Sequence, residues 1–217
     1  MKRKKILCFD FDGTLADSLY LEKMSMLKTV QDFGYESVTL ENIEEYFGPT
    51  EPGVIQHIVS KEESTAAVSY FYRIYIEYQN SLLRKNDAMI NMLKTLQQQS
   101  DAQLVIVTGR AKETLEITLP YLGLNNFFLQ CYTGSEHGVN KAESMRQVLK
   151  DFDCEKEDVL YIGDTLKDIE VMKQEGYDIL SASYYHDNEY QKLLEENNPG
   201  NVLNSIDSLT ERLLSII

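Results

Sequence analysis

Two carboxylates separated by a single residue lie near the start of this 217-residue chain, in the stretch Asp10-Phe11-Asp12-Gly13-Thr14. They follow a short apolar run, so both are expected at the carboxyl end of a buried strand, where ligand sites form in parallel sheets. A divalent cation with oxygen ligands would offset the repulsion between such close acids. Asp and Gly are also common turn residues. This stretch alone therefore favours a metal site, and a simple loop remains the alternative.

Two further predicted strands end in polar groups. One runs into Thr108-Gly109-Arg110, where a hydroxyl and backbone N–H groups near a helix start can donate hydrogen bonds to an anion. The other ends in Gly163-Asp164-Thr165, and Asp168 follows one helical turn later, so both acids can face one point. Lys141 precedes that strand at a predicted helix start, and a Lys there can reach over the same place as a compact cation. We expect these side chains to converge.

Short, continuous apolar runs predict the strands that position these groups. Runs without polar alternation are typical of strands covered on both faces, as in the parallel sheets of α/β proteins. Helix-length segments with apolar residues three and four apart lie between them; Asp87 is expected to cap the first, and Gly176 to end a later one. The predicted strands are 5–9, 103–108, 127–132, 158–163 and 178–182.

One interval has helical periodicity but no convincing strand. We therefore predict a small α-helical cap domain, residues 18–86, inserted into a Rossmann-like three-layer α/β core with a mainly parallel sheet, residues 1–17 and 87–217. The predicted cap helices are 19–33, 40–47, 54–59 and 65–79.

Composition excludes some partners. A formal charge of -14 argues against nucleic acid, which is bound by clustered Lys and Arg. No apolar run approaches the roughly 18 residues that span a bilayer, so no membrane association is expected. Cys8, Cys131 and Cys154 are odd in number and lack metal-ligand spacing, which favours a reducing cytoplasmic location. Monomer and homodimer both remain open.

Taken in order, the strand-end motifs resemble the haloacid dehalogenase superfamily, and within it the phosphatase branch that carries a helical cap after the first motif, as in phosphoglycolate phosphatase-like members. The resemblance spans most of the chain. It rests on Asp10-Phe-Asp-Gly-Thr-Leu-Ala-Asp-Ser18, Val107-Thr108-Gly109, Lys141 and Gly163-Asp164-Thr-Leu-Lys-Asp168.

This resemblance implies that Asp10 is the nucleophile of an aspartyl-phosphate mechanism. Asp12 would protonate the leaving group and then deprotonate water, so its pKa should be raised. Mg²⁺ would be held by Asp10, the Asp12 carbonyl and Asp164, and Asp168 would either support the metal through water or orient Lys141.

Phosphate oxygens would be held by Thr108, Gly109 and Lys141. Lys141 departs from the family pattern, because Ala142 stands where Pro is common. The loop from Gly48 to Glu51, with Thr50 in it, is the first candidate for substrate discrimination.

The expected partner is a small phosphorylated metabolite, phosphoglycolate-like or a sugar phosphate. A phosphomutase, a pyrophosphatase, a phosphonatase with a cap lysine and a non-catalytic phosphometabolite-binding regulator remain alternatives, whereas a dehalogenase would not need Asp12. Arg110 could touch the substrate, but it is interpreted as a solvated or salt-bridged surface residue. The three histidines are interpreted as exposed or core residues; they are His57, His137 and His186.

Overall fold

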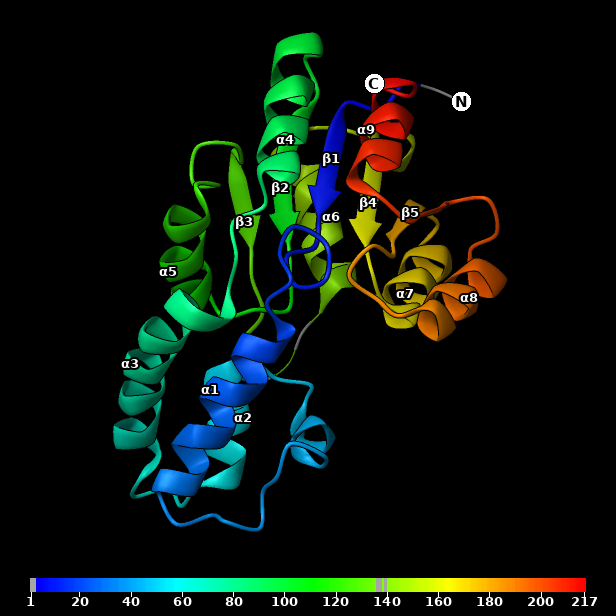
Figure 1. The fold of residues 1–217 in the computed structure, drawn as a ribbon. Coiled ribbons are helices and arrows are strands. Elements are labelled where there is room, and N and C mark those ends of the chain that lie inside the picture. Colours follow the sequence, from blue (N-terminus) through cyan, green and yellow to red (C-terminus); the bar gives the residue numbers. More distant parts are fainter. Residues whose placement is uncertain (1–2, 136–137, 139) are drawn as a thin grey trace.

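A six-stranded sheet forms the centre of the protein, in a computed structural model that describes residues 3–135, 138 and 140–217 (Figure 1). Its order is β3-β2-β1-β4-β5-β6, and every neighbouring pair is parallel. The five predicted strands are present, but β3 is shorter than predicted, and β6 was not predicted because two residues carry no periodic pattern. The strands are β1 (Ile6–Phe9), β2 (Gln103–Val107), β3 (Gln130–Tyr132), β4 (Val159–Gly163), β5 (Asp178–Ala182) and β6 (Val202–Leu203).

Helices cover both faces of the sheet. In β1, Leu7 and Phe9 join the apolar cluster that contains α4, α5 and α9, whereas Ile6 and Cys8 join the cluster on the opposite face with α6, α7 and α8. All four residues are buried, as the continuous apolar run predicts, and the α/β three-layer fold is confirmed. The helices are α4 (Asp87–Gln99), α5 (Lys112–Leu122), α6 (Lys141–Asp151), α7 (Leu166–Glu175), α8 (Asn188–Asn197) and α9 (Ile206–Leu214).

The segment between β1 and α4 folds into helices that pack on one another beyond the carboxyl ends of the strands (Figure 1). These are α1 (Leu19–Asp32), α2 (Glu51–Ile58) and α3 (Ser64–Leu82). The prediction of a helix over 40–47 is wrong, because only a short 3₁₀ helix forms there, at Ile43–Tyr46. Ile43 is the only buried residue of that turn, and a single apolar anchor does not support a longer helix.

Two predicted helix ends had different outcomes. Asp87 does not cap α4; the side chain of Asn86 does, accepting hydrogen bonds from the N–H groups of Ala88 (3.1 Å) and Met89 (3.4 Å). Asp87 is instead the first residue of the helix, where an acidic charge is favourable. Gly176 ends α7 in the left-handed conformation as predicted, with φ of 76°.

The central strand fixes where a site can form. Phe9, the last residue of β1, pairs with Ile106 on one side and with Ile162 on the other, so the loops after β1, β2 and β4 open at one level of the same edge. The chain leaves β1 toward β2 and returns later to its other side through β4, which makes this edge a topological switch point. No helix within the described ranges is long and apolar enough to cross a membrane.

Candidate active site

Three carboxylates meet at this edge of the sheet. Asp10 follows β1, Asp164 follows β4, and Asp168 lies in the first turn of α7; all three are buried. One carboxylate oxygen from each lies within 4.8 Å of the others. Residues about 150 positions apart in sequence are therefore close enough to share one cation.

Gly13 leaves room for this arrangement. Its φ is 71°, and a Cβ atom built on it would lie 1.9 Å from Oδ2 of Asp164. Any larger residue would displace that carboxylate as well as strain the backbone. Thr14 then donates a long hydrogen bond to Oδ1 of Asp164, at 3.4 Å. The Gly-Thr pair after Asp12 therefore shapes the space that Asp164 occupies.

Lys141, the first residue of α6, lies between two of the carboxylates. Its ammonium group pairs with Asp10 and with Asp168, the latter at 2.6 Å. Asp168 also accepts hydrogen bonds from the Tyr161 hydroxyl (3.2 Å) and from the N–H (3.2 Å) and hydroxyl (2.7 Å) of Thr165. These contacts occupy both oxygens of Asp168 and fix its carboxylate beside the ammonium group of Lys141. In this structure Asp168 therefore orients Lys141.

Burial dominates the electrostatics of the cluster. It raises the pKa of Asp10 to about 7, although the charge of Lys141 acts in the opposite direction. Burial also raises the pKa of Asp164. Burial acts on Asp168 in the same direction, but the charge of Lys141 together with hydrogen bonds from Lys141 and Thr165 outweighs it, so the pKa of Asp168 is lowered. Three buried acids with one buried Lys carry excess negative charge, and their donors are all carboxylate oxygens. Such a set fits a hard divalent cation such as Mg²⁺.

The predicted phosphate-binding residues lie around the same cavity of about 460 Å³. Thr108 is buried there, and its hydroxyl accepts a hydrogen bond from the Arg110 N–H (3.3 Å). Thr50, from the loop before α2, is also buried against it. Gly134 lets the backbone around it pass close to Gly109 and Thr50, because a Cβ atom on Gly134 would lie 2.2 Å from the Gly109 carbonyl oxygen and 2.9 Å from the Thr50 side chain. The residues predicted for this role that line the cavity are Thr50, Thr108, Gly109 and Lys141.

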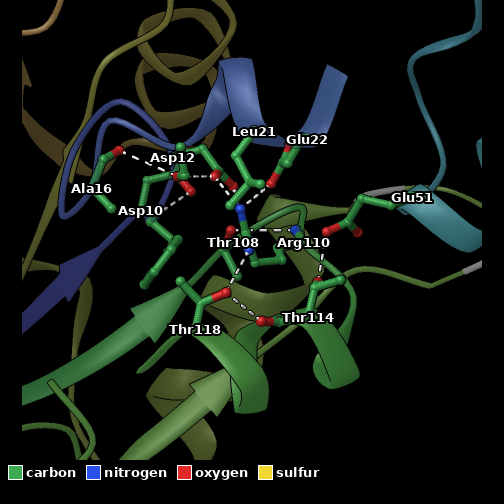
Figure 2. A network of polar contacts seen from close by, with 12 residues as sticks. Asp10, Asp12, Ala16, Leu21, Glu22, Glu51, Thr108, Arg110, Thr114 and Thr118 are labelled. Carbon is green, nitrogen blue, oxygen red and sulfur yellow. Dashed lines mark hydrogen bonds and ion pairs between the residues drawn. The ribbon is translucent and has the colours of Figure 1, made fainter. Parts of the chain in front are cut away.

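Arg110 forms salt bridges, but its interpretation as a surface residue was wrong. Only 3% of it is exposed, and each of its five guanidinium N–H groups has an acceptor within the protein. Figure 2 shows Arg110 among Asp12, Glu22 and Thr118. Nε and Nη2 donate to the two oxygens of Asp12, at 3.2 and 2.6 Å. Nη2 also donates to Glu22, and Nη1 donates to the hydroxyls of Tyr75 and Thr118, the latter at 3.2 Å. Glu22 and Tyr75 come from α1 and α3, which the sequence around Arg110 gives no means of anticipating.

This network also reverses the predicted protonation of Asp12. Burial raises the pKa of Asp12, but the Arg110 guanidinium and hydrogen bonds from Arg110, Glu22 and Ser18 outweigh burial, so the pKa is lowered. Glu22 shows the opposite result. Burial and the nearby Asp12 carboxylate raise its pKa well above the ordinary value. Asp12 and Glu22 thus share one guanidinium and interact with each other. Arg110 favours the ionised form of Asp12, whereas the pKa of Glu22 favours its protonated form.

Glu51 provides a second connection between the inserted helices and the core. It is the first residue of α2, and its carboxylate accepts hydrogen bonds from the N–H of Ala111 (2.8 Å) and the hydroxyl of Thr114 (2.6 Å). Both donors belong to the start of α5, where unpaired N–H groups favour an acidic partner (Figure 2). The inserted helices are thus held to the core by buried polar contacts.

His186 is a site residue that the sequence did not indicate. Its Nε2 lies 2.7 Å from Oδ2 of Asp164, and its ring packs on Tyr190 with centroids 4.4 Å apart. The signal available was its place just after β5, whose carboxyl end opens at the same edge. His57 is exposed, as expected, and His137 lies outside the described residues.

Comparison with known proteins agrees with this geometry. Residues 7–182 match the model of the family described as haloacid dehalogenase-like hydrolase. A phosphoglycolate phosphatase of Aquifex aeolicus is 26% identical over 175 residues, covering 79% of this chain and 81% of the relative. Pyrophosphatase PpaX of Listeria innocua is 29% identical over 172 residues, covering 77% of each chain.

Solved structures share the fold over nearly the whole chain. A predicted phosphoglycolate phosphatase from Haemophilus somnus superposes with a TM-score of 0.79 at 17% identity, over 98% of this chain and 99% of that one. CbbY from Rhodobacter sphaeroides, crystallised with phosphate, gives a TM-score of 0.74 at 16% identity, over 95% and 96% of the two chains. The sequence match over most of its length shows that this chain belongs to the haloacid dehalogenase-like hydrolase family.

Proposed function

We propose that the protein is a Mg²⁺-dependent phosphatase that hydrolyses a small phosphorylated metabolite through an aspartyl-phosphate on Asp10. One observation carries the proposal. The buried carboxylates of Asp10, Asp164 and Asp168 lie within 4.8 Å of one another, Asp10 and Asp164 line a cavity, and Lys141 pairs with Asp10. The relatives named as phosphatases and pyrophosphatases support the same reaction class.

In the proposed reaction a carboxylate oxygen of Asp10 forms a bond to phosphorus, and the bond from phosphorus to the ester oxygen breaks. The leaving oxygen takes a proton from Asp12. Asp12 then removes a proton from water, which attacks the phosphorus and releases inorganic phosphate from Asp10. Thr108, the Gly109 N–H and Lys141 stabilise the oxygens of the transferred group.

The metal site in this proposal consists of Asp10, Asp164 and the backbone carbonyl of Asp12, and Asp168 acts mainly by orienting Lys141. When bound, Mg²⁺ would supply positive charge that reduces the repulsion between the acids and the phosphate. The lowered pKa of Asp12 keeps its carboxylate ionised, which is the form that can accept a proton from water. A phosphate dianion bound beside it favours the protonated form that the first step needs.

The proposal also keeps the division into a core, 1–17 and 87–217, and a cap, 18–86, with Thr50 at the substrate. The buried contacts of Glu22 and Glu51 with α5 and its preceding loop support a cap that covers the cavity. A small cytoplasmic metabolite is the proposed substrate. Pyrophosphate is the alternative that the PpaX relatives favour.

Release of phosphate from p-nitrophenyl phosphate tests this function. We expect turnover with Mg²⁺ that is abolished by a chelator and by Asp10→Asn, and retained by Asp101→Asn, an exposed acid outside the cavity. Mass spectrometry of acid-quenched wild-type enzyme should detect phosphate on the peptide that contains Asp10. Turnover that survives Asp10→Asn would refute the proposed nucleophile.

A further inference from the structure

Acids outnumber cations around the cavity above Asp10. Its described lining contains six carboxyl groups but only three Lys or Arg side chains. The acids are Asp10, Asp12, Asp17, Glu22, Glu51 and Asp164, and the cations are Arg110, Lys141 and Lys167. The excess remains whether or not Glu22 carries a proton. One divalent cation and Lys141 can offset the phosphate group, but little positive charge is left for anything attached to it.

The cations of this lining already have partners. All five N–H groups of Arg110 are bonded within the protein, so the guanidinium has no donor left for a ligand. Lys141 is bound to Asp10 and Asp168. Lys167 pairs with Glu170 at 2.8 Å, and its side chain is 73% exposed, which places the ammonium in solvent at the mouth of the cavity.

The inserted segment also contributes an apolar surface to the cavity. The cavity residues that form it are Leu19, Met26, Phe47, Pro49 and Val54. The start of α2 also lies here, but its first two residues are Glu51 and Pro52, a carboxylate and a residue without an N–H. This helix start therefore offers less to an anion than an ordinary one does.

From this charge distribution we infer that the substrate is a phosphate monoester of an uncharged alcohol, and that a second anionic group on the substrate is disfavoured. The inference rests on the proposed function, in which the phosphate lies at Asp10 and the leaving group faces the apolar surface. A carboxylate or second phosphate there would meet apolar side chains and uncompensated acids, and would lose its hydration without gaining a cation. Phosphoglycolate and pyrophosphate carry such a group.

An isosteric pair of substrates isolates the charge. We expect kcat/KM for phosphoglycolate to be at least about tenfold below that for its neutral amide, and pyrophosphate to be equally poor, because an unpaired like charge is disfavoured at a site without a free cation. p-Nitrophenyl phosphate reports whether the enzyme is active at all. If none of these compounds is hydrolysed, the proposed function fails, and this inference fails with it. If phosphoglycolate or pyrophosphate is hydrolysed as fast as the amide, only this inference fails.

A cation placed on the apolar surface provides a second readout. Leu19 lines the cavity and is 40% exposed, whereas Leu193 is equally exposed on α8 outside it. Leu19→Arg should raise the kcat/KM ratio of phosphoglycolate to its amide about tenfold, and Leu193→Arg should leave the ratio unchanged. Comparing ratios removes the intrinsic difference between the leaving groups. Equal shifts in both variants would trace the effect to bulk charge and overturn the inference.

Discussion

The guanidinium of Arg110 donates two hydrogen bonds to the carboxylate of Asp12, 98 positions earlier in the chain, and holds it in a partly buried ion pair. The same guanidinium contacts Glu22 and Tyr75 of the inserted helices. The proposed acid-base residue is therefore aligned by a contact that also ties α1 and α3 to the core. Its geometry depends on the position of those helices.

Removing Arg110 should destabilise the fold. Arg110→Met leaves Asp12 and Glu22 without their shared cation, and losing one partner of a buried ion pair costs about 3–5 kcal/mol of unfolding free energy. Adding Asp12→Asn to this variant should recover part of the loss, because the pKa of Asp12 is lowered and its orphaned carboxylate becomes a neutral amide. Urea denaturation measures both, with Arg73→Met, an exposed arginine of α3, as the control. A loss no larger than that of Arg73→Met would show that the network contributes little.

Mg²⁺ affinity should depend on pH through Asp10. Burial raises the pKa of this carboxyl to about 7, so its protonated form is well populated at and below pH 7, and only the ionised form binds a cation. Affinity should fall about tenfold per pH unit below 7 and level off above it. Raising the Mg²⁺ concentration should move the acidic limb of kcat/KM to lower pH. Calorimetric titration between roughly pH 6 and 8 checks this, and an affinity that is constant over that range would contradict it.

Gly13→Ala should damage the proposed metal site more than the fold. The added Cβ would lie 1.9 Å from Oδ2 of Asp164, so this carboxylate must move. We expect Mg²⁺ affinity to fall by at least about tenfold, as when a group that supports a metal ligand is lost. Gly176→Ala is the matched control, because its φ of 76° is similar but nothing lies within 4 Å of a Cβ there. Both variants should show the backbone strain of roughly 1–2 kcal/mol in unfolding experiments. Equal Mg²⁺ affinity in the two variants would rule out the steric explanation.

Loss of His186 should weaken metal binding without abolishing it. The imidazole lies 2.7 Å from Asp164 and restrains its carboxylate, and partners of metal ligands typically affect affinity about 10–100-fold. His186→Ala should therefore raise the Mg²⁺ concentration needed for half-maximal activity, while kcat at saturating Mg²⁺ stays within a few-fold. His57→Ala, on the exposed side of α2, should change neither quantity. A large fall in kcat at saturating Mg²⁺ would instead indicate contact with the reacting groups.

Much of the fold could be predicted from the chain alone. Buried parallel strands must be apolar on both faces, and this requirement leaves continuous runs such as the one that ends at Phe9. Acids and small residues directly after such runs lie where ligand sites form in parallel sheets, so Asp10, Thr108 and Asp164 could be selected as candidates. Short elements fared worse, since β6 and the 3₁₀ turn at Ile43–Tyr46 contain too few residues for periodicity to identify them.

Only the tertiary structure decided how these groups are charged and partnered. Burial of Arg110, the lowered pKa of Asp12 and the contact of His186 with Asp164 all depend on side chains brought from other elements. Local sequence determines which residues end each strand, because hydrophobic runs and turn residues act over a few positions. Pairing energies and desolvation depend on distances through space, and Glu22 has no sequence relation to Arg110 that would reveal the ion pair between them.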